Sequence, residues 1–76
     1  MEILVGENPI EDYLKQAKEA LEKEAITIKG KGRDTVKAVD LAELLKLEGI
    51  KVKEIKIDTE EVDEKRISII LIEMEK

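Results

Sequence analysis

The spacing of apolar residues alternates between two patterns along this chain, and this alternation limits the folds it can adopt. Apolar residues three or four positions apart are typical of a helix with one buried face, whereas every second residue is typical of a half-buried strand. Strands are expected at Met1–Val5, Ala25–Lys29, Ile50–Ile57 and Ile67–Met74. Helices are expected at Pro9–Leu21 and from Asp34 or Thr35 to Glu48, between the first and second and the second and third strands. The order βαβαββ predicts a two-layer α/β (α+β) fold, with two helices on a four-stranded mixed sheet and a final hairpin. A chain of 76 residues has room for this one domain, residues 1–76.

Individual residues mark the expected ends of the helices. Asn8 can cap the first helix, with Pro9 at its first position, where the missing N–H is no loss. Gly49 follows the second helix, at the position where a left-handed residue commonly ends a helix. We therefore expect the first helix to begin at Pro9 and the second to close at Gly49.

The apolar residues of the third strand change parity midway: Ile50 and Val52, then Ile55 and Ile57. Side chains of successive strand residues point to opposite faces, so a regular strand would turn the second pair away from the core. One extra residue near Lys53 or Glu54 would keep all four inward, and the sequence therefore predicts a β-bulge there.

Two elements carry more apolar residues than one core requires. On the second helix, one set that could face the core is Val36, Val39, Leu44 and Leu47, and the rest of the circumference carries Ala38, Leu41, Ala42 and Leu45. The last strand is apolar on both faces, so burying one face leaves an apolar row exposed. Small chains with such two-sided elements gain most from a symmetric dimer. We expect a homodimer interface that includes Leu41, Leu45, Ile70 and Ile72.

Composition excludes several kinds of chemistry. The chain has no Cys and no His, which removes disulfides, thiolate chemistry, imidazole bases and the usual zinc sites. Ser68 has no histidine to activate it, and no carboxylate is set apart as a general acid. We predict a non-enzyme without catalytic residues, metal, cofactor or small-molecule substrate. No stretch approaches the roughly 18 apolar residues of a membrane span, and we expect a cytoplasmic protein with no membrane contact.

Charge and aromatic content limit how the chain could bind nucleic acid. Fourteen Lys and Arg stand against nineteen Asp and Glu, a net charge of −5 that repels polyanions overall. Tyr13 is the only aromatic residue, so successive bases cannot be stacked on a series of rings. The simpler interpretation of Tyr13 is a ring packed at the edge of the core with its hydroxyl in water.

The segment Gly30-Lys31-Gly32-Arg33 is the best candidate for a binding site. Two glycines let the backbone approach a phosphate, and the following helix directs N–H groups and the positive end of its dipole toward it. Lys29 and Lys37 are placed to join it. Because the segment lacks the P-loop and dinucleotide signatures, an ordinary strand-to-helix turn with solvated lysines stays open as the alternative.

These same residues resemble a known family. The stretches Ile26-Thr-Ile-Lys-Gly-Lys-Gly-Arg33, Lys37-Ala-Val-Asp40 and Ile50 to Ile57 are similar to the Alba family, small nucleic-acid-binding proteins of archaeal chromatin and RNA metabolism. The resemblance implies a homodimer whose bodies and projecting hairpins contact duplex DNA or RNA through the backbone. It matches Lys31, Gly32 and Arg33 to the basic loop, Tyr13 to a tyrosine of the first helix, and Asn8 to a position before the proline.

The chain also departs from that pattern. Glu7 and Asn8 stand where the family usually has two lysines, and the stretch from Asp58 to Glu64 is short and acidic where the family has a longer, basic hairpin. Two hypotheses follow. The chain is either a homodimer that binds DNA or RNA without sequence preference, weakly and with strong dependence on salt, or an Alba-like dimeric scaffold that has lost this affinity and serves as a structural or protein-interaction module.

Overall fold

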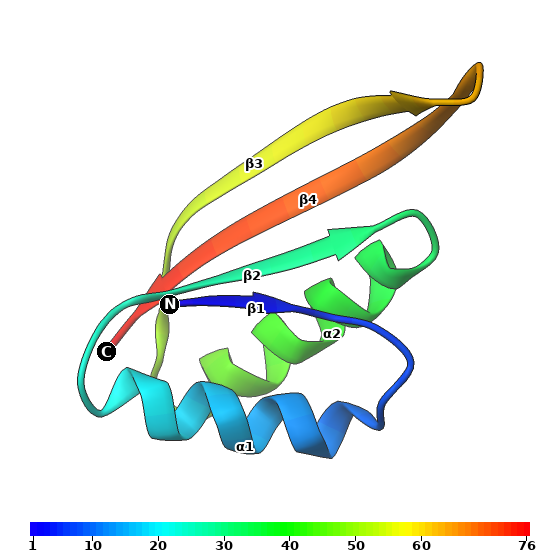
Figure 1. Ribbon diagram of the computed structural model, residues 1–76. Coiled ribbons are helices and arrows are strands. Elements are labelled where there is room, and N and C mark those ends of the chain that lie inside the picture. Colours follow the sequence, from blue (N-terminus) through cyan, green and yellow to red (C-terminus); the bar gives the residue numbers. More distant parts are fainter.

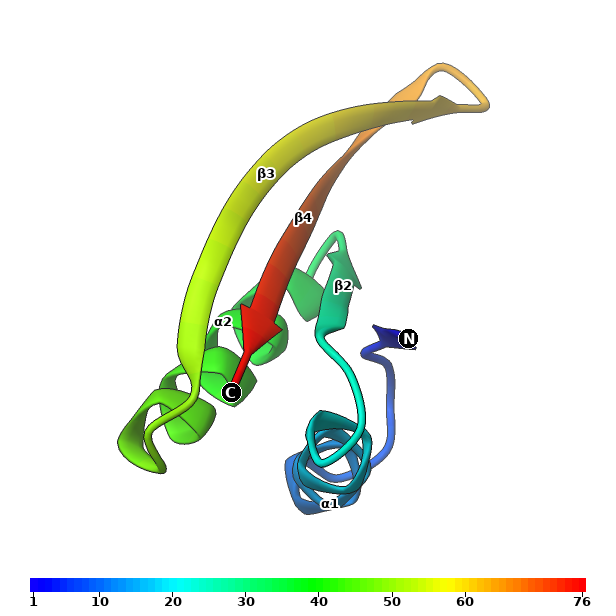
Figure 2. The same cartoon turned by 90° about the vertical axis from the view of Figure 1, so that its left-hand side faces the viewer.

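The computed structural model describes all residues from 1 to 76 and has the predicted element order. The elements are β1 (Glu2–Leu4), α1 (Ile10–Leu21), β2 (Ile26–Lys31), α2 (Asp34–Leu47), β3 (Lys51–Val62) and β4 (Lys65–Glu75). They form one four-stranded sheet in the order β1-β2-β4-β3, and both helices lie on the same side of it (Figure 1; Figure 2). Strand β1 runs parallel to β2, whereas β4 is antiparallel to both β2 and β3. The predicted fold and the final hairpin are thus confirmed.

The core lies between the two helices and the centre of the sheet. Strands β2 and β4 contribute the pairs Ile28 with Ile72 and Ile26 with Met74, all fully buried. The buried residues of α2 are Ala38, Leu41, Ala42 and Leu45. The core of α2 is thus formed by the other set of apolar residues than the one first named from the sequence, since Val36, Val39 and Leu47 are exposed.

A close approach of α2 to the sheet explains which side of the helix is buried. Gly30 of β2 lies directly under the helix: a Cβ atom added there would come within 2.7 Å of the Asp34 carbonyl oxygen and 2.8 Å of the Ala38 Cβ. Only a small residue at position 38 fits against a glycine at this spacing, so Ala38 faces the sheet and the larger Val36 and Val39 turn outward.

The predicted β-bulge is present in β3. Val52 pairs with Met74 and Glu54 with Glu73, so the register shifts by one residue at Lys53. Ile55 and Ile57 then pair with Ile72 and Ile70, on the side of the sheet that carries the helices. The expectation that they would be buried is nevertheless wrong, because 55% of Ile55 and 78% of Ile57 is exposed. Strand β3 is the edge strand of the sheet, and α2 packs directly over Gly30 of β2, so Ile55 and Ile57 are left uncovered although they lie level with Ile28 and Gly30.

The helix ends agree in part with the sequence signals. After α2, Gly49 has φ +85°, its N–H donates to the Lys46 carbonyl, and the N–H of Ile50 donates to the Leu45 carbonyl. This is a Schellman motif, and the predicted left-handed cap is confirmed. The predicted cap of α1 is wrong: the helix begins at Ile10, Pro9 takes the cap position with ψ 147°, and no side chain caps it. Because this ψ is extended, Asn8 lies one residue too far from the helix to cap it.

The acidic segment belongs to strand β3 rather than to a short loop. Strand β3 continues to Val62 and β4 begins at Lys65, so only Asp63 and Glu64 form the turn. Both have positive φ, 49° and 65°, which is typical of a type I′ hairpin turn. The resulting long hairpin projects from the body of the molecule (Figure 1).

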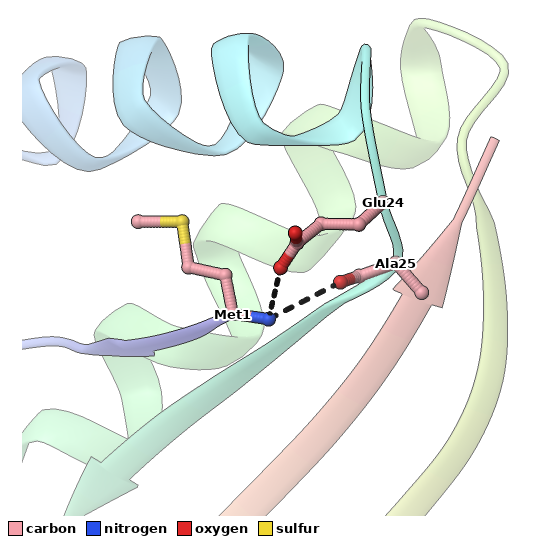
Figure 3. Close-up of polar contacts among 3 residues, drawn as sticks. All are labelled: Met1, Glu24 and Ala25. Atoms are coloured by element: carbon pink, nitrogen blue, oxygen red, sulfur yellow. Dashed lines mark hydrogen bonds and ion pairs between the residues drawn. The ribbon is translucent and has the colours of Figure 1, made fainter.

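The amino terminus is attached to the start of β2. The Met1 amino group donates to Glu24 Oε1 at 2.6 Å and to the Ala25 carbonyl at 3.5 Å (Figure 3). The hydrogen bond and the charge of this ammonium lower the pKa of Glu24 from its ordinary value. The contact places β1 beside β2 from the first residue. Neither helix is long and apolar enough to cross a membrane.

Candidate nucleic-acid interface

Lys31 is the last residue of β2 and not part of a loop. The antiparallel ladder with β4 continues to Lys31, which lies opposite Ile69. Since Gly30 faces the helices, its neighbour Lys31 points to the outer face, the side of the sheet away from them. The Lys31 ammonium lies 3.3 Å from Glu60 Oε2 of β3. The prediction that Lys31 lies in the turn before α2 is wrong, because β2 ends two residues later than expected.

Gly32 and Arg33 form the turn into α2. Gly32 has φ +56°, a conformation that favours glycine, and its N–H donates to the Ser68 carbonyl at 2.8 Å. Arg33 takes the cap position of α2 and is exposed. Arg66 is the only arginine that forms an ion pair, so no carboxylate lies within 4.0 Å of the Arg33 guanidinium. Among the cations predicted to contact a phosphate, Arg33 alone lies at the start of α2 as expected. Its charge is also unpaired.

Lys29 lies on the outer face of β2, two residues before Lys31. Its ammonium is 4.0 Å from Glu2 Oε1 of β1, and most of its side chain is covered. Lys29 and Lys31 therefore form a short row of cations along β2, each with a carboxylate from a neighbouring part of the sheet. Surface ion pairs that are at least partly exposed contribute only about 0–1 kcal/mol, so either carboxylate can be exchanged for another anion.

Lys37 has a structural role that its sequence position did not reveal. Its ammonium donates to the Gly6 carbonyl at 2.7 Å and to the Asn8 carbonyl at 3.0 Å. These bonds connect α2 to the segment between β1 and α1. A phosphate would have to compete with both carbonyls, so Lys37 is poorly placed as a free cation.

Tyr13 is buried within the core, with only 5% of the residue exposed. Its Oη accepts the N–H of Gly6 at 2.9 Å and the N–H of Asn8 at 3.3 Å. The predicted packing of the ring is confirmed, whereas the prediction of a hydroxyl in water is wrong. Tyr13 and Lys37 together hold the segment from Gly6 to Asn8 through its backbone. The seven-residue spacing of Gly6 and Tyr13 was visible in the sequence, but it did not show that the hydroxyl returns to this backbone.

A shallow hollow lies where this segment meets the start of α2. Its lining combines both signs of charge: Glu7, Asn8, Pro9, Ile10, Arg33, Asp34, Val36, Lys37 and Asp40. Asn8 and Arg33 thus line the same hollow. The three carboxylates make this surface less attractive to a phosphate than the two cations alone would.

The expected dimer residues are mostly used within the chain. Leu41, Leu45 and Ile72 are fully buried in its own core, and only Ile70 is partly exposed. An apolar groove of about 340 Å³ lies between α2 and the hairpin instead. Its lining residues are Thr35, Val36, Val39, Asp40, Ile57, Ser68, Ile69 and Ile70. The surface available for a partner is therefore this groove, with Ile55 beside it in β3.

The comparison with known families agrees with the fold. The model of the Alba family matches residues 1–59. This chain belongs to the Alba family. Among solved structures it is similar to Alba from Thermoplasma volcanium, with 28% identity, full coverage of both chains and a TM-score of 0.87. It also shares its fold with ALBA1 from Trypanosoma brucei, with 22% identity and a TM-score of 0.89 over 99% of this chain and 68% of that one.

Proposed function

We propose that this Alba-family chain forms a homodimer that binds duplex DNA or structured RNA through the phosphate backbone, without sequence preference. The exposed and unpaired guanidinium of Arg33 at the start of α2 is the observation that carries the proposal. Lys31 is a second contact from the adjoining strand end. Neither a catalytic group nor an aromatic platform contributes, so the proposed activity is binding by charge alone.

The apolar groove between α2 and the hairpin supports the dimer. It exposes Val36, Val39 and Ile57, and Ile55 extends the apolar surface along β3. Contiguous apolar surfaces with polar rims mark interaction sites in soluble proteins. A two-fold interface would cover the groove of both copies and would give the assembly two Arg33 and Lys31 pairs.

The number of cations sets the expected strength of binding. Two copies with Lys31 and Arg33 neutralise at most about four phosphates, which gives a slope of log affinity against log salt of roughly −3.6. Raising the salt from about 50 to 200 mM would then weaken binding by roughly 150-fold. Binding is thus confined to low salt, where counterion release is most favourable.

A second candidate function is a dimeric scaffold without affinity for nucleic acid. The ion pair of Lys31 with Glu60 and the acidic residues of β3 favour it, because they cancel positive charge beside the candidate site. On this hypothesis the groove still forms the dimer interface, and the outer face of the sheet and the hairpin are free to contact other proteins.

Titration of fluorescent duplex DNA and RNA across a salt series distinguishes the two functions. We expect wild type to bind at about 50 mM salt and the double variant Lys31→Ala/Arg33→Ala to lose most of that affinity. The double variant Lys15→Ala/Lys23→Ala removes the same charge from exposed lysines without ion pairs and is the control. No binding by the wild-type dimer at this salt would exclude the nucleic-acid function and leave the scaffold.

A further inference from the structure

We propose that Glu60 acts as an internal competitor for nucleic-acid phosphates at Lys31 and thereby sets the affinity of the interface. The inference rests on the proposed function and concerns its regulation. It is carried by the contact between the Lys31 ammonium and Glu60 Oε2, 3.3 Å apart. Glu60 is the only carboxylate within ion-pair distance of Lys31.

The contact spans the width of one strand. Lys31 of β2 lies opposite Ile69, and Glu60 of β3 lies opposite Ile67, both residues of the intervening β4. All four side chains are on the outer face, since residues two apart on a strand share a face. Lys31 and Glu60 therefore reach toward each other over β4. Ile69, on the same outer face between them, is 8% exposed.

The ion pair between Lys31 and Glu60 is exposed enough for a phosphate to replace the carboxylate. The side chains of Lys31 and Glu60 are 42% and 44% exposed, so water and an incoming anion can reach both. Carboxylate and phosphate oxygens accept hydrogen bonds from the same ammonium group, and solvent-exposed ion pairs are weak enough to be displaced. A phosphate that binds Lys31 must separate it from Glu60 and then remain close to that negative charge.

Arg33 provides the contrast within the same turn. Its guanidinium has no carboxylate within 4.0 Å, so a phosphate displaces only water and counterions there. Lys31 and Arg33 are two residues apart, yet only Lys31 forms an ion pair with a carboxylate of the chain. Neutralising Glu60 should therefore strengthen binding through Lys31 and leave the contribution of Arg33 unchanged.

The test compares two variants that change the charge by the same amount. Glu60→Gln removes the proposed competitor, and Glu64→Gln removes a carboxylate of the same hairpin that forms no ion pair. By anisotropy at about 50 mM salt, we expect Glu60→Gln to bind duplex DNA about three- to tenfold more tightly than wild type. The salt slope should steepen by about one for each phosphate contact that is gained. Glu64→Gln should stay within about twofold of wild type.

The same substitution in a Lys31→Ala background separates a local contact from a general effect of charge. The gain from Glu60→Gln should fall to less than about twofold there, because the group that it releases is missing. Equal gains for Glu60→Gln and Glu64→Gln, or a gain that persists without Lys31, would overturn the inference while the proposed function stands. A flat titration for wild type and every variant would overturn the proposed function, and the inference with it.

Discussion

Replacing Gly30 with alanine tests whether this glycine serves the packing of α2 or the approach of a phosphate. The added Cβ would lie 2.7 Å from the Asp34 carbonyl oxygen and 2.8 Å from the Ala38 Cβ. Both atoms belong to the first turns of a helix held by the core, so neither can move away as the end of a flexible side chain could. The helix must shift or the strand must bend.

Overpacking of this kind destabilises a protein by about 1–3 kcal/mol. For 76 residues, at roughly 2.1 cal/mol/K per residue, the entropy of unfolding is about 0.16 kcal/mol/K. We therefore expect Gly30→Ala to lower Tm by about 6–19 °C. Thermal denaturation followed by circular dichroism measures this, at one protein concentration for all variants because a dimer makes Tm depend on concentration.

Gly6→Ala is the matched control. A Cβ at Gly6 would lie 3.4 Å from Tyr13 Oη, an ordinary contact, and its φ is not positive. Its Tm should change little or rise slightly, because alanine restricts the unfolded chain. If Gly30→Ala melted at the wild-type temperature and bound duplex DNA more weakly, the packing role would be refuted and the backbone at Gly30 would be assigned to phosphate binding.

Three further substitutions test the Tyr13 hydroxyl, the apolar groove and the ion pair between Met1 and Glu24. Tyr13→Phe removes the acceptor of two backbone N–H groups and should lower the free energy of unfolding by about 1–3 kcal/mol in urea; an unchanged value would mean that water replaces the hydroxyl. Ile57→Asp should give a folded monomer by light scattering, since the side chain is largely exposed within one chain, and a persistent dimer would place the interface elsewhere. The pKa of Glu24 is lowered by the Met1 ammonium, so this pair stabilises the fold at pH values above the ordinary carboxyl pKa, and the contribution is lost as the pH falls through the depressed pKa. Glu24→Gln should weaken the dependence of Tm on acid pH, and identical acid profiles would refute the coupling.

Features that depend on neighbours in the sequence could be predicted. The bulge at Lys53 follows from the parity of the flanking apolar residues, and the end of α2 follows from Gly49. The side of α2 that is buried could not be derived this way, because its apolar residues cover most of the circumference. A contact distant in the sequence decides it: Gly30 admits only the small side chain of Ala38 at this spacing.

The candidate site was harder to predict for the same reason. Residue type identified Lys31, Arg33 and Lys37 as cations, but not what each one contacts. Lys37 reaches a backbone segment about thirty residues away, and Lys31 meets a carboxylate across an intervening strand. Arg33 differs because a turn residue at a helix end has few neighbours, so its local sequence was sufficient to place it.

Under the proposed function, the contrast between these cations accounts for binding of a polyanion by an acidic protein. The net charge of −5 per chain, −10 for the proposed homodimer, repels DNA at long range. That repulsion is screened over a Debye length of roughly 8–10 Å at about 0.1–0.15 M salt, whereas contacts at hydrogen-bond distance are not. Added salt therefore weakens the repulsion and also the gain from counterion release, and the two effects oppose each other. If Glu60 competes as proposed, the strength of binding depends less on the total charge than on whether Lys31 is free of Glu60, because distant carboxylates are screened and the contact at the phosphate is not.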